Sequence, residues 1–277
     1  MVLETSNLQG GYGDTTIVQQ VSLTLHQGEW LSILGANGSG KSTLLRLCGR
    51  ILSPQQGTIW LSGDDIHSLS PTAVARKLAL LPQQQILPAG LSVYQLVSLG
   101  RSPHQPWWQW DLTAADHQQI EQALAWTDME QYRHVPVSAL SGGQRQRAFL
   151  ALALAQQPKV LLLDEPTTYL DIHYQLQLLE LLKQLNQKQQ LAIITVLHDI
   201  NLAVRYSDRL ALMREGTLWA VGAVADTLTP DIVNQVFDVD VAIVDTPVGP
   251  QICPLTAKQS APTPPNETVE LASSPET

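Results

Sequence analysis

The sequence predicts an α/β fold with a mixed, largely parallel sheet, an antiparallel β-subdomain at the N-terminus and an inserted α-helical subdomain. Short buried apolar runs, at residues 160–163 and 192–197, alternate with helical patterns such as residues 174–187. This alternation is typical of a parallel sheet covered by helices. Between about residues 84 and 157 the pattern is mainly helical, so this stretch is expected to interrupt the α/β core.

The first 83 residues predict most of the antiparallel strands. Residues 1–30 alternate apolar and polar side chains around a glycine-rich turn at residues 10–13. Residues 57–63 resemble a second hairpin piece and are expected to join the same sheet. The apolar run at residues 78–81 predicts a buried strand that stops at Pro82, because proline cannot donate to a ladder of hydrogen bonds.

These patterns predict one nucleotide-binding domain over residues 1–257 with a tail. Its core comprises residues 1–83 and 158–237, its helical subdomain residues 84–157, and its C-terminal extension residues 238–257. The tail, residues 258–277, contains four prolines and no aromatic residue, and is expected to be disordered. A loop at residues 104–110 contains three tryptophans, whose rings either pack within the insert or mark an interface.

Composition limits the classes of function. The net charge is −9 with no long basic run, which disfavours a nucleic-acid partner. Two distant cysteines, Cys48 and Cys253, predict neither a disulfide scaffold nor a structural zinc site. No secretory signal and no apolar stretch of 18 residues is found, so a cytoplasmic chain without its own membrane span is expected. Asp208 and Arg209 are expected to form an ordinary surface pair.

The most specific motif is a complete G-x-x-x-x-G-K-[ST] phosphate loop between an apolar run at residues 30–34 and a helix-like stretch at residues 44–47. Its glycines let backbone N–H groups point at phosphate oxygens, and the new helix presents its positive end to the same anion. Lys41 would add a charge at the β- and γ-phosphates, and the Ser42 hydroxyl would bind Mg²⁺. A plain glycine turn is the alternative, which the flanking strand disfavours. The sequence therefore predicts a chain that binds a nucleoside triphosphate, and a phosphate loop alone fits kinases, GTPases, motors and ATPases alike. The loop comprises Gly35, Ala36, Asn37, Gly38, Ser39, Gly40, Lys41, Ser42 and Thr43.

A second motif narrows this prediction. The apolar run at residues 160–163 ends in Asp164 and Glu165. A buried strand would bring both carboxylates to the sheet edge where the phosphate loop lies. Asp164 would hold Mg²⁺ beside Ser42, and Glu165 would polarise the attacking water as a general base. An exposed acidic pair at a strand end is the structural alternative.

A third motif, residues 140–144, reads Leu-Ser-Gly-Gly-Gln and opens an apolar helix that Pro158 terminates. A serine hydroxyl, two glycines and a helix N-terminus form another possible anion site. In isolation, a glycine helix cap would be the better interpretation. The predicted ligand residues here are Ser141, Gly142, Gly143 and Gln144.

With these three motifs in this order, the chain resembles the ATP-binding subunits of ABC transporters over roughly residues 2–255. The resemblance also includes the Pro-Thr-Thr-Tyr-Leu-Asp run at residues 166–171 and the pair His198-Asp199. Residues 80–83, 100–103, 141–151 and 197–201 are similar to the importer branch for ferric chelates, especially iron(III) dicitrate transport ATPases. That branch also transports haem and cobalamin.

The resemblance assigns further roles at matching positions. Tyr12 would stack on adenine, although it could equally be a turn tyrosine. Gln83 would reach Mg²⁺ and the attacking water, but the run Gln83-Gln84-Gln85 leaves the choice of glutamine open by one. His198 would contact the γ-phosphate; its alternative is to satisfy a backbone carbonyl. Asp171 would belong to a loop that crosses a dimer interface.

The resemblance implies an ATPase that energises import of iron(III) dicitrate or a ferric siderophore across the bacterial inner membrane. Its cofactors would be ATP and Mg²⁺. Its partners would be a second copy, two integral-membrane permease subunits and, indirectly, a periplasmic binding protein, with no nucleic acid. The chain would lie peripherally on the cytoplasmic face of that membrane. Alternatives are a haem or cobalamin importer, a soluble ABC-type ATPase acting on DNA or ribosomes, and a regulatory module without turnover.

Overall fold

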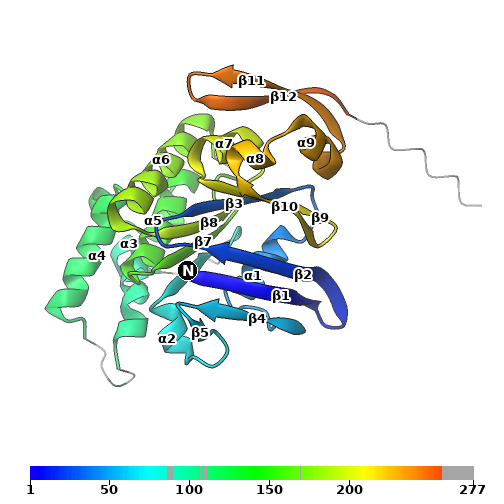
Figure 1. Ribbon diagram of the computed structural model, residues 1–277. Helices are drawn as coiled ribbons and strands as arrows, with labels where there is room; N and C mark the ends of the chain where they lie inside the picture. Colours follow the sequence, from blue (N-terminus) through cyan, green and yellow to red (C-terminus); the bar gives the residue numbers. More distant parts are fainter. Residues whose placement is uncertain (86–89, 107, 109–110, 169, 258–277) are drawn as a thin grey trace, which may run out of the picture.

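The computed structural model describes residues 1–85, 90–106, 108, 111–168 and 170–257 (Figure 1). The N-terminal sheet has four strands in the order β2-β1-β4-β5. All of its pairings are antiparallel, and residues 57–63 join it as predicted. Its strands are β1 (Leu3–Tyr12), β2 (Thr15–Leu25), β4 (Gln56–Leu61) and β5 (Asp64–Asp65).

The second sheet has six strands in the order β10-β9-β3-β8-β7-β6. Five neighbouring strands are parallel, and only the edge strand β10 runs antiparallel. The predicted mixed α/β fold is therefore confirmed. Because β6, β7, β3 and β8 are parallel, their carboxyl ends lie at one edge of the sheet. The strands are β3 (Trp30–Gly35), β6 (Leu78–Leu81), β7 (Val160–Asp164), β8 (Ala192–Val196), β9 (Arg209–Arg214) and β10 (Thr217–Ala223).

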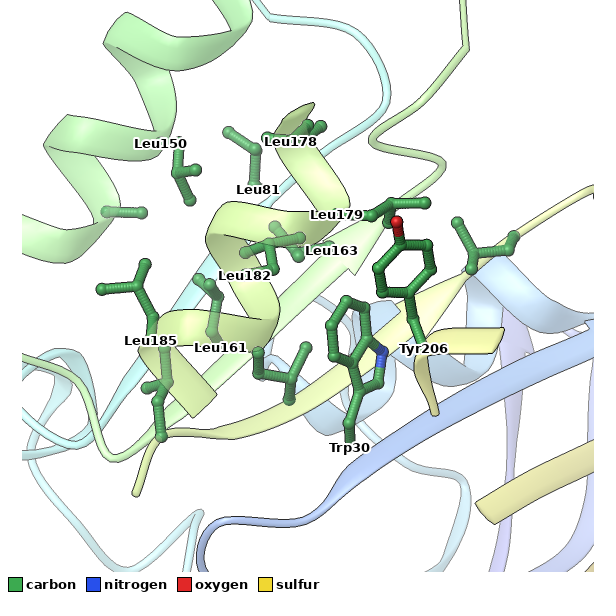
Figure 2. Close-up of a cluster of buried hydrophobic side chains, with 14 of the residues drawn as sticks. Trp30, Leu81, Leu150, Leu161, Leu163, Leu178, Leu179, Leu182, Leu185 and Tyr206 are labelled. Atoms are coloured by element: carbon green, nitrogen blue, oxygen red, sulfur yellow. The ribbon is translucent and has the colours of Figure 1, made fainter. Parts of the chain in front are cut away.

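Helices cover this sheet and complete two hydrophobic clusters. Every residue of β7 is buried, and its side chains alternate between the clusters: Leu161 and Leu163 face one, Val160 and Leu162 the other. Figure 2 shows the first cluster, in which α6 leucines pack beside Trp30 and Tyr206. Such burial stabilises each leucine by about 1.5–3 kcal/mol. The helices outside the insert are α1 (Lys41–Cys48), α2 (Pro71–Ala75), α6 (Ile172–Gln189), α7 (Ile200–Tyr206), α8 (Val224–Thr227) and α9 (Pro230–Phe237).

The stretch between β6 and β7 is helical. Three of its helices begin at capping boxes, in which Ser92, Thr113 and Ser141 accept from a backbone N–H three residues on. The elements are α3 (Val93–Ser98), η1 (Leu99–His104), α4 (Ala114–Trp126), η2 (Glu130–Tyr132), η3 (Val137–Ala139) and α5 (Gly142–Ala155). Of the tryptophan-rich loop, Trp108 is exposed and residues 107, 109 and 110 lie outside the described residues.

A C-terminal hairpin of β11 (Val239–Thr246) and β12 (Gly249–Ala257) lies against α7. Asn201 fastens it: its Oδ1 accepts from the Ile252 N–H at 2.7 Å and its Nδ2 donates to the Ile252 carbonyl at 3.2 Å. The tail at residues 258–277 lies outside the described residues, and the division into core, helical subdomain and extension stays a prediction. Among the described helices, none has the length and hydropathy needed to cross a membrane.

The expected surface pair of Asp208 and Arg209 was wrong. Asp208 Oδ2 accepts from the Trp30 N–H at 2.8 Å, and Arg209 Nη1 lies 2.9 Å from Glu29 Oε1. Both residues therefore fasten the start of β9 to the start of β3. Asp208 contacts the first residue of β3, and Arg209 contacts Glu29 immediately before that strand.

Candidate nucleotide-binding site

The phosphate loop connects the end of β3 to the start of α1. Two glycines make its path possible. A Cβ on Gly35 would lie 2.2 Å from the Met213 carbonyl oxygen, so only glycine allows this approach to β9. Gly40 precedes the helix with φ of 98°, a left-handed conformation that favours glycine. The first backbone N–H groups of α1 therefore point into the loop, where they can bind an anion.

Lys41 lies inside this loop. Its Nζ donates to the carbonyls of Gly35 and Ala36, both at 2.9 Å. Burial lowers the pKa of the Lys41 ammonium, and the negative charges of Glu165 and Asp164 partly offset this by raising it. The adjoining pocket has a volume of about 210 Å³, and it is lined by Ile17, Asn37, Gly38, Gly40, Lys41, Ser42, Thr43 and Glu165. Ile17 was not predicted, because an apolar residue of an alternating strand carries no signal of its own.

Ser42 and Asp164 meet where α1 approaches the end of β7. The Ser42 hydroxyl donates to Asp164 Oδ1 at 2.8 Å, and Asp164 is only 3% exposed. Burial raises the pKa of the Asp164 carboxyl, and the negative charge of Glu165 adds to this rise, whereas the Ser42 hydrogen bond opposes it. A cation would stabilise this buried carboxylate in its charged form.

The donor set at Ser42 and Asp164 fits Mg²⁺. A hydroxyl and a carboxylate are hard oxygen ligands, and Mg²⁺ is usually held by one or two carboxylates together with substrate phosphates. Among the described residues, no group of three or more His, Cys, Asp and Glu side chains could hold a metal by itself.

Glu165 follows the end of β7 and contacts one side chain from the loop after β8 and one from the loop after β6. His198 Nε2, after β8, lies 2.7 Å from Glu165 Oε1. Gln83 Nε2, after β6, donates to Oε2. Glu165 itself has φ of 52°, a left-handed conformation that is uncommon for residues other than glycine and often marks functional sites. The structure thus brings together three of the residues predicted from sequence.

The three glutamines after β6 now differ in their contacts. Gln83 contacts Glu165, Gln84 is exposed, and Gln85 Nε2 donates to Gln146 Oε1 on α5 at 3.2 Å. This arrangement favours Gln83 as the residue at the site. It also shows a link between the loop after β6 and helix α5, which the sequence did not suggest.

Tyr12 lies at the end of β1, on the rim of this region. The residue is 43% exposed, and its hydroxyl accepts from Arg46 Nη1 at 2.6 Å. Arg46 belongs to α1, so the contact fixes the tyrosine relative to the phosphate loop. An exposed, oriented ring at this place is compatible with stacking on a base, which stays a prediction.

The predicted anion site at residues 141–144 is separate from the phosphate loop of the same chain. Ser141 Oγ accepts from the Gln144 N–H at 3.4 Å, and Gln144 Oε1 accepts from the Ser141 N–H at 3.0 Å. Both residues therefore act as helix caps in the single chain; Ser141 is exposed and Gln144 is half-buried. None of residues 141–144 lines the phosphate-loop pocket. Asp171 caps α6 in a similar way, accepting from the Tyr174 N–H at 3.1 Å.

Comparison with known proteins agrees with this geometry. The family model described as ABC transporter matches residues 18–168. The chain belongs to the ABC transporter family. The iron(3+)-hydroxamate import ATP-binding protein FhuC of Bacillus subtilis (strain 168) is 44% identical over 245 residues, which cover 88% of this chain and 91% of that protein. The ferric enterobactin transport ATP-binding protein FepC of Escherichia coli (strain K12) is 39% identical over 256 residues, which cover 91% and 94%.

Solved ABC transporter structures share the fold. An inward-facing ABC transporter of metal-chelate type superposes with a TM-score of 0.80 at 29% identity, covering 92% of this chain and 98% of that one. The dimeric cassette MJ0796, a bacterial ABC transporter cassette, superposes with a TM-score of 0.70 at 28% identity, covering 80% and 98%. The fold predicted for this ABC protein is therefore confirmed at the level of the whole cassette.

Proposed function

We propose that this chain is the ATP-hydrolysing subunit of an ABC importer for ferric chelates, either iron(III) dicitrate or a ferric siderophore. The similar proteins from Bacillus and Escherichia coli carry names of iron-hydroxamate, siderophore and ferric enterobactin transport, at 39–44% identity. A cobalamin import protein of Halobacterium salinarum is less similar, at 37%, and this chain covers 65% of its length. Ferric chelates are therefore the favoured cargo, with cobalamin as the second candidate.

The cluster around Glu165 is the observation that supports hydrolysis. Glu165 would accept a proton from the attacking water, and His198 and Gln83 would orient that water and the γ-phosphate. Lys41 and the N–H groups of α1 would stabilise the charge that develops on the phosphoryl oxygens. Mg²⁺, held by Ser42, Asp164 and Gln83, would neutralise phosphate charge when bound. Such preorganised donors act without reorganisation during the reaction.

A second copy of the chain would complete the site. The pocket of one chain is lined by the phosphate loop and Glu165 but by none of residues 141–144. Ser141 and the two glycines that follow are exposed or half-buried at the start of α5 and free to meet a ligand held elsewhere. We therefore infer that ATP is enclosed between the phosphate loop of one copy and Ser141 of the other, with Asp171 at the junction. The dimeric form of a similar cassette supports this arrangement.

Two permease subunits would dock on a groove beside β6. The groove has a volume of about 370 Å³, and Ile51 on its wall is 65% exposed. It lies between the end of α1, helix α2 and Gln156 at the end of α5. A transmembrane partner would hold the chain at the cytoplasmic face of the inner membrane and connect it to a periplasmic binding protein.

Glu165→Gln tests the catalytic assignment. The variant should bind ATP, lose nearly all hydrolysis and accumulate as an ATP-bound dimer in size-exclusion chromatography. Glu130→Gln, at an exposed glutamate of η2, is the matched control and should hydrolyse at the wild-type rate. Normal turnover by Glu165→Gln would rule out Glu165 as the base.

Uptake tests the cargo. Cells that lack this chain should lose import of radiolabelled ferric citrate or a ferric siderophore, and the wild-type chain should restore it whereas Glu165→Gln should not. Loss of cobalamin uptake with normal iron uptake would favour the second candidate.

A further inference from the structure

Thr168 contacts Glu165 at two points. Its backbone N–H donates to the Glu165 carbonyl at 3.2 Å, which closes a tight turn. Its hydroxyl donates to Glu165 Oε2, also at 3.2 Å. Thr168 is part-buried, and the Glu165 side chain is only 10% exposed. Water therefore competes little for these bonds.

The conformation of Glu165 explains why such a contact is useful. A residue other than glycine is strained in the left-handed region, and a glutamate side chain has several rotamers. The turn bond from Thr168 stabilises the backbone at this point, and the hydroxyl selects a single direction for the carboxylate. Because threonine is β-branched, its own χ1 is restricted, so the hydroxyl is a stiff support.

The other two contacts of the carboxylate come from different strands. Gln83 follows β6 and His198 follows β8, whereas Thr168 lies on the same loop as Glu165. Any change at Gln83 or His198, such as contact with a nucleotide, alters those bonds independently of the loop. Among the contacts that the described residues make with this carboxylate, the Thr168 bond comes from the same loop and moves together with Glu165.

We infer that Thr168 is a positioning residue for the catalytic carboxylate, an inference that rests on the proposed ATP hydrolysis. Thr168 holds Oε2 throughout the cycle. When His198 turns to the γ-phosphate, Oε1 is released and becomes the oxygen that accepts the proton of water. Thr168 acts through Glu165 in this role, by its contacts with that residue.

Thr168→Val tests this role because valine keeps the shape and removes the hydroxyl. Steady-state ATP hydrolysis is measured on the full-length chain, together with affinity for a fluorescent ATP analogue and the melting temperature. The variant should lose kcat by about tenfold, the effect of one hydrogen bond to a charged group, with KM within about twofold. Thr168→Ser keeps the donor and should retain kcat within about threefold. If valine lowers the melting temperature, Thr168→Ala replaces it and should show the same loss of kcat.

A double-mutant cycle separates positioning from general stability. In the Glu165→Gln background, Thr168→Val should change the residual rate by less than about twofold, because the carboxylate that it supports is gone. Full kcat in Thr168→Val, an equal loss in Thr168→Ser, or an undiminished tenfold loss in the Glu165→Gln background would overturn the inference. Failure of the proposed function gives a different result, namely normal hydrolysis by Glu165→Gln alone.

Discussion

A buried ion pair fastens the helical insert, and Asp116→Asn is the perturbation that tests its contribution. Arg101 Nε lies 2.8 Å from Asp116 Oδ1, and both side chains are 6% exposed. Arg101 Nη1 also donates to the Ala155 carbonyl at the end of α5, at 2.7 Å. Thr113 donates its hydroxyl and its N–H to Asp116 Oδ2, at 2.7 and 3.0 Å. The carboxylate therefore connects η1, α4 and, through Arg101, the helix that begins after Ser141.

The expected loss of stability follows from the pKa of Asp116. Burial alone would raise this pKa, but the hydrogen bonds from Arg101 and Thr113 outweigh burial and hold the pKa at about 2 instead of 3.8. A fall of this size, at about 1.4 kcal/mol per pH unit, corresponds to about 2 kcal/mol of folding free energy at neutral pH. Because the folded-state pKa is the lower one, this stabilisation is present above about pH 4 and is lost as the pH falls toward 2, with about half gone at pH 3.

Urea unfolding, followed by tryptophan fluorescence and far-UV circular dichroism, measures this effect. Asp116→Asn should lose about 2 kcal/mol at pH 7, and its difference from wild type should shrink as the pH is lowered toward 3. Glu121→Gln on the same helix is the control. Glu121 forms an ion pair with Arg133, and the Arg133 and Glu121 side chains are 36% and 43% exposed. Because water screens such an exposed pair, Glu121→Gln should lower the free energy of unfolding by less than about 1 kcal/mol. An equal loss in both variants, or a loss that does not depend on pH, would refute the reasoning.

Three further predictions concern the phosphate loop and the thiols. Lys41→Ala should lower ATP hydrolysis by more than about a hundredfold, because the charged partner of the phosphates disappears; an unchanged rate would contradict the assignment of the loop. Ser42→Ala should raise the Mg²⁺ concentration needed for half-maximal hydrolysis, since the hydroxyl beside Asp164 is lost, and an unaltered Mg²⁺ titration would argue against a metal there. Complete burial raises the pKa of the Cys48 thiol to about 12, whereas Cys253 is exposed. Iodoacetamide at pH 8 should therefore label only Cys253 in the folded protein and both thiols in urea; rapid native labelling of Cys48 would disprove its burial.

The buried strand β7 and the phosphate loop could both be predicted, because short stretches of sequence determine them. The apolar run before Asp164 predicted a buried strand, and in the structure the four apolar residues of β7 pack into the two hydrophobic clusters. The spacing of glycines around Lys41 predicted the phosphate loop, because glycines at these positions let the backbone curl so that its N–H groups point at phosphate oxygens. Both features can be recognised from neighbouring residues in the sequence, without knowledge of long-range contacts.

Contacts between distant segments were not predictable in this way. Asp208 pairs with the backbone of Trp30, 178 residues away, and no local pattern reports such a partner. Thr168 was missed because one threonine in a Pro-Thr-Thr run has no periodic or spacing signal; only its hydrogen bonds to Glu165 reveal it. In the proposed dimer, Ser141 would contact ATP that a second copy holds, so one folded copy would not contain the complete site.

The structure of the Glu165→Gln variant with Mg-ATP tests the central claim most directly. The proposed mechanism predicts two copies around each nucleotide, with Ser141 Oγ of one copy within about 3 Å of a γ-phosphate oxygen bound to the loop of the other. A nucleotide-loaded structure in which Ser141 remains remote from every γ-phosphate would contradict it.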